Sequence, residues 1–285
     1  MSKREGACLN KLKPRHSLVI IIPTYRRTDR QVTFEWIPPE WQSRVAFVLD
    51  EKDKKVLKKK YGYTGCSFVV HPIEIDSIAK KRAWIIKQKE WDKILMLDDD
   101  LRLDTRRGKK EGSDWFRLLK ATPEEAAHAL RRVESKLDKL VHVGIGARQY
   151  NRGLQNGWNY NKRMMYALGY RTSVVRKVCE LGRIEHREDM DYTLQLLKLG
   201  FQNAIRGDFA VGQAGLYNSK GGVSASGRTI KASNADAVLL AKLHPGLVKV
   251  VEREYSKSLK RQEVICYWEK AYGALAELED SNVLI

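Results

Sequence analysis

The sequence predicts an α/β fold in which helices flank a mostly parallel central β-sheet. Short continuous apolar runs, rich in β-branched residues, alternate with amphipathic segments along most of the chain. Such runs are typical of parallel strands buried on both faces, and their alternation with helices indicates βαβ units. The 285 residues are 43% hydrophobic, which is enough for the core of one large domain.

Four strands are expected in the N-terminal part of the chain. They cover residues 18–22, 44–50, 67–70 and 93–97. Polar groups follow the first, second and fourth of these strands, at residues 23–27, Asp50 and residues 98–100. Ligands of open α/β sheets bind beyond the carboxyl ends of the strands. We therefore expect these groups to share one cleft.

The pattern continues through the rest of the core. A helix is expected over residues 77–89, and a second begins with a capping box at residues 122–125. Residues 141–147 have the composition of a buried strand. A further helix covers residues 188–199, and Gly200 is well placed to adopt the left-handed conformation that ends it.

Composition divides the chain into three parts. Residues 1–16 form a basic N-terminal arm, and residues 17–215 form the α/β core. Residues 216–285 begin with a Gly-rich loop and continue as a basic, helical C-terminal region, which we expect to pack on the same domain. No internal repeat and no linker separates these parts.

The net charge of +18 indicates polyanionic partners such as nucleic acid, a nucleotide or an anionic lipid surface. The four cysteines lack CxxC spacing, which argues against a zinc site and fits a reducing compartment. No run approaches the length of about 20 apolar residues that spans a membrane, and no signal peptide is evident. We therefore expect a cytoplasmic protein without stable membrane insertion.

Three consecutive aspartates, Asp98, Asp99 and Asp100, follow the fourth strand. Alternate residues of a strand share a face, so Asp98 and Asp100 would point together and Asp99 elsewhere. Paired carboxylates suit Mg²⁺ or Mn²⁺, which also bind diphosphate oxygens. The alternative is an acidic turn whose carboxylates accept hydrogen bonds from nearby backbone N–H groups.

A second acidic cluster, Glu188, Asp189 and Asp191, opens the last predicted helix of the core. Acidic residues in a first turn complement the helix dipole and cap the helix, which is a structural interpretation. The functional interpretation is a general base, which needs a carboxylate within hydrogen-bond reach of an acceptor hydroxyl.

Four motifs follow one another along the chain: "VIIIPTYRR", "SIAKKRAWII", "ILMLDDDL" and "REDMDYTLQLLKLG". Together they resemble nucleotide-sugar glycosyltransferases of the GT-A fold, a Rossmann-like α/β architecture, over residues 17–215. In that family a DXD motif holds a metal ion and a Glu-Asp motif opens a later helix. The resemblance implies transfer of a sugar from a UDP-sugar with the help of Mn²⁺ or Mg²⁺.

The resemblance also assigns roles to individual residues. Asp98 and Asp100 would bracket the metal, Asp189 would deprotonate the acceptor, and Glu188 would orient the sugar or acceptor. The donor would be bound by Pro23, Thr24, Tyr25, Arg27, Asp50, Arg82 and Asp99. Among these, Thr24 and Tyr25 would line the nucleobase and ribose pocket. Metal-dependent relatives often add a histidine where this chain has Gln213, which is a poorer ligand.

Charge and a second resemblance point to the acceptor. Basic runs and interleaved aromatics, as at residues 106–116, suit a phosphate backbone with an unpaired base. "YNSKGGVSASGR" and "LHPGLVKVVERE" are similar to phage and TET/JBP-associated glycosyltransferases, which modify 5-hydroxymethylpyrimidines in DNA. That implies UDP-glucose as donor, a phage-infected host cytoplasm, and DNA or substrate contacts by Lys220, Gly221, Gly222 and Arg228. The interpretation of the Gly-rich segment as an ordinary surface loop stays open.

Three other functions remain open. A polysaccharide, lipid-linked or protein acceptor would let the basic surface meet an anionic membrane. A non-catalytic nucleic-acid-binding protein on a transferase scaffold is the alternative from another class, although the intact Asp98, Asp100 and Asp189 argue against it. A nucleotidyltransferase would also use carboxylates and a metal ion.

Overall fold

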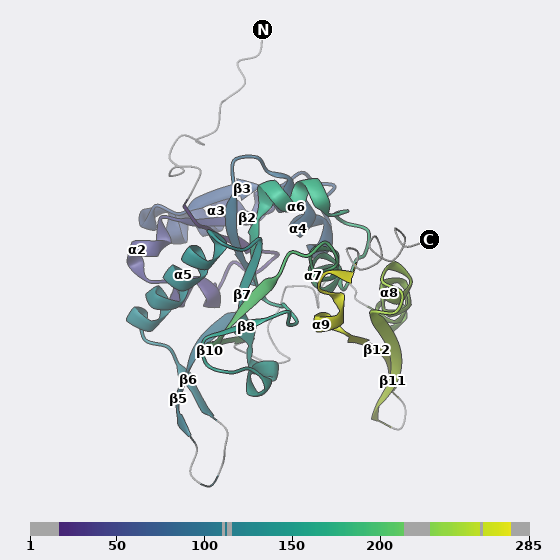
Figure 1. Ribbon diagram of the computed structural model, residues 1–285. Helices are drawn as coiled ribbons and strands as arrows, with labels where there is room; N and C mark the ends of the chain where they lie inside the picture. The colour runs from purple at the N-terminus through teal and green to yellow at the C-terminus, as the bar shows by residue number, and fades with distance from the viewer. Residues whose placement is uncertain (1–16, 110–111, 113–115, 214–228, 257–258, 275–285) are drawn as a thin grey trace.

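The computed structural model describes residues 17–109, 112, 116–213, 229–256 and 259–274 (Figure 1). Lys220, Gly221, Gly222 and Arg228, together with the expected N-terminal arm, therefore lie outside the described residues.

The centre of the protein is one large sheet with the strand order β3–β2–β1–β4–β9–β7–β10–β5–β6, and β8 also pairs with β10. Its strands are β1 (Val19–Pro23), β2 (Val45–Leu49), β3 (Ser67–Val70), β4 (Lys93–Leu97), β5 (Leu101–Lys109), β6 (Phe116–Lys120), β7 (His142–Ala147), β8 (Trp158–Tyr160), β9 (Ala167–Arg171) and β10 (Asn203–Gln213). The helices of this part are α1 (Val32–Trp36), α2 (Pro39–Gln42), α3 (Glu51–Tyr61), α4 (Ile78–Lys87), α5 (Pro123–Leu137), α6 (Thr172–Val178) and α7 (Glu188–Lys198), with short 3₁₀ turns η1 (Gly62–Thr64) and η2 (Arg148–Gly153).

The predicted N-terminal strands form one parallel half of the sheet. β1 lies between β2 and β4 and pairs in parallel with both, and β3 pairs in parallel with β2. Ile20 of β1, for example, lies opposite Val45 and Leu95. Because these strands share one direction, the residues that follow β1, β2 and β4 emerge at the same edge of the sheet.

The other half of the sheet is mixed. β9 runs antiparallel to β4 and β7, while β7 and β10 are parallel to each other. β5 and β8 also run against β10. Most strands nevertheless share the direction of β1, so the predicted α/β architecture with a mostly parallel sheet is confirmed.

Both faces of the sheet are buried. Ile20 and Ile22 pack on one side with Phe34 of α1 and Val133 of α5. Ile21 points to the opposite side, where the core includes helices α4, α6 and α7. This burial explains why the parallel strands are continuously apolar rather than alternating. The capping box predicted at the start of α5 is also present.

The C-terminal part differs from the helical region that the sequence predicted. Helix α8 (Ile230–Leu243) is followed by an antiparallel hairpin, β11 (Val248–Ser256) and β12 (Leu259–Cys266), and by the short helix α9 (Trp268–Ala271) (Figure 1). Leu240 and Val248 pack against Met190 and Leu194 of α7. The helical prediction was wrong over the hairpin because its charged residues mask a β-branched pattern. No helix in the described ranges is long and apolar enough to span a membrane.

Candidate functional site

The residues expected to form a cleft meet beyond the carboxyl ends of β1, β2 and β4. The chain after β1 is tied to β2, because Thr24 N donates to Val48 O at 2.9 Å. The aspartates after β4 are tied to α1, because Thr33 Oγ1 donates to the carbonyl of Asp98 and accepts from Leu101 N at 2.9 Å. The sheet therefore fixes both loops side by side.

Two arginines neutralise the three aspartates. Arg27 bonds to Asp99 and lies 3.2 Å from Asp100 Oδ2, while Arg82 Nη2 lies 2.6 Å from Asp98 Oδ1. The alternation expected of a strand does not extend to these residues, because β4 ends at Leu97 and the aspartates follow in a turn. As a result Asp99 and Asp100 share one arginine, and Asp98 faces the other.

Arg82 connects the aspartates to the second acidic cluster. Its Nη1 lies 2.5 Å from Glu188 Oε1, so the guanidinium of α4 bridges the end of β4 and the first turn of α7. Arg82 and Glu188 are both buried. Burial lowers the pKa of Arg82, but the charges of Asp98 and Glu188 outweigh it and raise the pKa above its usual range. Asp189, the next residue of α7, is half-buried, and its charge acts on Arg82 as well.

Negative charge is in excess at this site. Burial raises the pKa of Asp99 to about 7 despite Arg27, and it also raises the pKa of Asp100. Burial likewise raises the pKa of Glu188 to about 7 despite Arg82. Burial is the main cause of these rises in pKa, so an added cation would stabilise the ionised forms of the carboxylates.

The donor set fits a hard divalent cation. Arg82 engages one oxygen of Asp98, and Arg27 engages one oxygen of Asp100, so each carboxylate has a second oxygen to offer as a ligand. Among the described residues no three His, Cys, Asp or Glu side chains form a complete metal cage. Two carboxylates completed by phosphate oxygens are the usual arrangement for Mg²⁺.

Gln213 lies beside these aspartates. It ends β10 and is opposite Leu101, the residue that follows Asp100. The register thus places it where the sequence comparison expected an additional ligand position.

Two side chains beside Thr24, Tyr25 and Asp50 were not assigned a role in the sequence analysis: the cation Lys81 and His71, whose pKa burial lowers. The Lys81 ammonium donates to Thr24 O at 2.9 Å and lies 5.7 Å from the centre of the Tyr25 ring. Burial lowers the pKa of Lys81. His71 Nε2 lies 2.8 Å from Asp50 Oδ1. His71 follows the end of β3, so the strand-end rule that identified Asp50 also applies to it.

Tyr166 is a further residue that no sequence signal indicated. It has a left-handed backbone, with φ of +66°, and its carbonyl accepts from Asp98 N at 3.4 Å. A non-glycine residue in this region is strained by about 1 kcal/mol or more. The neighbouring strands hold it in place, next to the first aspartate.

Asp191 of the second cluster has a structural role instead of a catalytic one. It is fully buried, and its Oδ1 lies 2.7 Å from both Arg183 Nη2 and His244 Nε2. This ion pair joins α7 to the end of α8. Within the cluster, Glu188 is the residue bonded to Arg82, which also pairs with Asp98.

Comparison with known proteins agrees with this geometry. A family model described as TET-Associated Glycosyltransferase matches residues 18–222. No curated protein matches the sequence.

Two solved structures share the fold at low sequence identity. S. aureus TarS 1–349 in complex with UDP-GlcNAc aligns with a TM-score of 0.51 and 14% identity over 80% of this chain. The alignment covers 66% of the TarS fragment, just under two thirds of its length. Mycobacterium tuberculosis glucosyl-3-phosphoglycerate synthase, in complex with Mn²⁺, UDP and glucosyl-3-phosphoglycerate, aligns with a TM-score of 0.50 and 9% identity, covering 92% of this chain and 96% of that one.

The family match covers well over half of the chain and includes all four motifs from which the GT-A fold was expected. The strand order and the two GT-A neighbours confirm that fold. The chain therefore belongs to the TET-associated glycosyltransferase family.

Proposed function

We propose that this glycosyltransferase moves glucose from UDP-glucose to the 5-hydroxymethyl group of a modified pyrimidine in DNA, with Mn²⁺ or Mg²⁺. The observation that carries the proposal is the arrangement of Asp98–Asp100 opposite Glu188 and Asp189, with Arg82 bonded to both groups. This guanidinium links Asp98, a proposed cation ligand, to Glu188, the neighbour of the proposed base Asp189.

The donor would lie across the ends of the parallel strands. Pro23, Thr24, Tyr25 and Asp50 would bind the nucleoside, because they follow β1 and β2 at the same edge of the sheet. The TarS structure contains UDP-GlcNAc and the glucosyl-3-phosphoglycerate synthase structure contains UDP, which supports a uridine donor by analogy of fold.

The diphosphate would lie at the aspartates. Asp98 and Asp100 would hold the cation, which supplies charge stabilisation to the departing diphosphate. Arg27 would keep Asp99 and Asp100 in place and add positive charge near the nucleotide.

The acceptor hydroxyl would approach from the side of α7. Asp189 would accept its proton, and Glu188, fixed by Arg82, would position sugar or acceptor. The net charge of +18 supports a polyanionic acceptor such as DNA, because a nucleotide-sugar alone carries too little charge to account for it.

A transfer assay tests this proposal. The protein is incubated with labelled UDP-glucose, Mn²⁺ and DNA that contains 5-hydroxymethylcytosine, beside DNA of the same sequence with cytosine. We expect label on the modified DNA only, and a glycosylated nucleoside in mass spectra of the digested product.

Matched variants separate chemistry from donor binding. Asp189→Asn should abolish transfer while UDP-glucose still binds, whereas Asp191→Asn should retain catalysis in the protein that stays folded. Transfer at the normal rate by Asp189→Asn would refute the base assignment. Hydrolysis of UDP-glucose without transfer to any hydroxymethylated DNA would refute the acceptor.

A further inference from the structure

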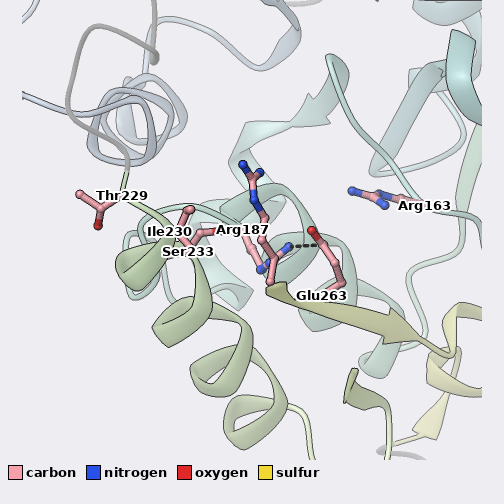
Figure 2. Close-up of a pocket in the computed structure, with 7 residues that line it drawn as sticks. Arg163, Arg187, Thr229, Ile230, Ser233 and Glu263 are labelled. Atoms are coloured by element: carbon pink, nitrogen blue, oxygen red, sulfur yellow. Dashed lines mark ion pairs between the residues drawn. The ribbon is translucent and has the colours of Figure 1, made fainter. Parts of the chain in front are cut away.

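A second cavity lies next to the catalytic helix, between α7, α8 and the β11–β12 hairpin. Its volume is about 290 Å³. Figure 2 shows side chains from these separate elements arranged around it. They are Arg187, Arg261, Glu263, Thr229, Ile230 and Ser233, together with Arg163 from the loop between β8 and β9.

The cavity is strongly cationic: among the described residues, three guanidinium groups and one carboxylate, that of Glu263, line it. Glu263 is shared between partners: its Oε2 lies 3.7 Å from Arg187 Nη1, and its Oε1 accepts from Tyr255 Oη at 3.1 Å. The three positive charges therefore exceed the negative charge by two.

Neutral groups hold two of the three arginines in position. Arg163 donates to Tyr150 Oη at 2.8 Å and stacks over the Tyr150 ring at 4.8 Å. Arg261 lies 5.4 Å from the centre of the Tyr255 ring. Within the described part of the chain, neither guanidinium is paired with a carboxylate. Arg163 Nε is, moreover, buried without a hydrogen-bond partner there, so an anion at this place would supply what it lacks.

The cavity adjoins the acceptor side of the site. Arg187 immediately precedes Glu188. The Cys266 thiol, whose pKa burial raises to about 12, lies near Arg163, Arg187 and Asp189. Arg163 also lies near Tyr166, together with Asp98 and Asp100. On its other side, the N-terminal turn of α8 contributes the Thr229 and Ser233 hydroxyls and the positive end of the helix dipole.

We propose that this cavity binds a backbone phosphodiester of the acceptor DNA, close to the nucleotide that receives the sugar. The inference rests on the proposed function, in which DNA is the acceptor. Arginine forks and hydroxyls are the groups that bind phosphate oxygens most often. The donor diphosphate has its own set of residues at Arg27 and the aspartates, so this second set of arginines serves a different phosphate. The volume exceeds that of a phosphate group alone and accommodates part of the attached sugar.

Binding of a chemically altered oligonucleotide tests the inference. The probe is a fluorescein-labelled oligonucleotide with one 5-hydroxymethylcytosine, and a series of probes carries one neutral methylphosphonate at successive positions around that base. Dissociation constants are measured by fluorescence anisotropy for the wild type, Arg261→Gln and Arg163→Gln. Arg131→Gln, which removes an exposed arginine of α5, is the matched control.

We expect Arg261→Gln and Arg163→Gln to weaken binding of the unaltered probe by about three- to tenfold and to lower the salt dependence by about one phosphate contact. At one methylphosphonate position the wild type should lose affinity by a similar factor, and the two variants should lose nothing more. Arg131→Gln should leave that position as sensitive as it is in the wild type.

The outcomes separate this inference from the proposed function. The cavity assignment would be overturned if, at every methylphosphonate position, the loss of affinity caused by the probe simply added to the loss caused by the arginine variant. This holds even if glucose is transferred to DNA. If one methylphosphonate position weakens binding of the wild type but not of the two variants, and no glucose is transferred, the phosphate site is supported and the proposed reaction is refuted. A protein that does not bind the probe at all contradicts both.

Discussion

Arg82 is the residue on which the geometry of the site depends. It is buried and bonds to Asp98 and Glu188, which lie 90 positions apart (188 − 98) in the sequence. A lysine could not replace it, because a single ammonium cannot bridge two carboxylates with a planar fork. Arg82 therefore fixes the end of β4 to the first turn of α7, in addition to the core packing between these elements.

Removing this bridge should destabilise the protein. Arg82→Met keeps much of the apolar stem but leaves two carboxylates without their cation, so we expect the free energy of unfolding to fall by about 3 kcal/mol. Urea denaturation at pH 7 measures the change. The Arg82→Met/Glu188→Gln double variant should lose less than the sum of the single losses; strictly additive losses would contradict a direct interaction.

His142 makes stability depend on pH. It is buried, its ring stacks on Tyr170, and its Nδ1 and Nε2 lie 2.9 Å from Gly169 O and 3.1 Å from Thr193 Oγ1. Burial lowers the pKa of His142 to about 4. In the unfolded chain the imidazole has its ordinary pKa of about 6.5. Between these values the unfolded state binds the proton and the folded state does not.

Stability should therefore fall as the pH falls from about 6.5 to about 4, by on the order of 3 kcal/mol from this residue. Urea titrations at pH 7 and pH 4.5 measure the loss. His142→Gln should lack this component of the pH dependence, whereas His128→Gln, which changes an exposed histidine of α5, should retain it. An identical pH dependence in wild type and His142→Gln would show that another group is responsible.

Among the elements, α5 shows most directly how local sequence determines structure. Thr122 Oγ1 accepts from Glu125 N at 3.3 Å, and Glu125 Oε2 accepts from Thr122 N at 2.8 Å. Thr122→Ala removes one half of this capping box, so we expect a loss of about 1 kcal/mol in the free energy of unfolding. Thr122→Ser keeps the hydroxyl and should be nearly neutral. Equal losses in both variants would show that the methyl group, not the cap, matters.

The sequence predicts the elements well where burial is uniform and poorly where it is not. β1, β2, β3 and β4 were predicted within a residue or two, because strands buried on both faces are continuously apolar. The β11–β12 hairpin was missed, because the solvent-facing side of each strand carries charged residues. Its apolar side, including Val248 and Val264, packs on α7 and α8, which the sequence alone does not bring together.

At the scale of the whole molecule, a buried carboxylate, that of Asp191, joins the C-terminal part to the core. Asp191 of α7 binds Arg183 and His244, which caps the end of α8. Asp191→Asn should weaken this junction by about 3 kcal/mol and increase hydrogen exchange in β11 and β12 more than in β1. Glu180→Gln, which removes the exposed partner of Arg183, should have little effect. Unchanged exchange in Asp191→Asn would contradict a role in docking the hairpin.

The sequence predicted that the candidate site residues lie at one edge of the sheet, but it did not predict the contacts between them. Strand ends placed residues 23–27, Asp50 and the aspartates in one cleft, because parallel topology brings carboxyl ends together. Which arginine would pair with which aspartate depends on the turn after β4 and on the position of α4, and neither has a sequence signature. Lys81 was missed because a lysine on a helix is usually exposed, yet this one reaches Thr24.

The account depends most on a divalent cation at the aspartates that follow β4, and electron paramagnetic resonance of Mn²⁺ tests this directly. The signal of free Mn²⁺ is recorded as the protein is added with and without UDP, for the wild type and for Asp98→Asn/Asp100→Asn. We predict that the wild type removes the free-ion signal in the presence of UDP and that the double variant does not. Equal Mn²⁺ binding by both proteins, or none by the folded wild type with UDP, would contradict the account.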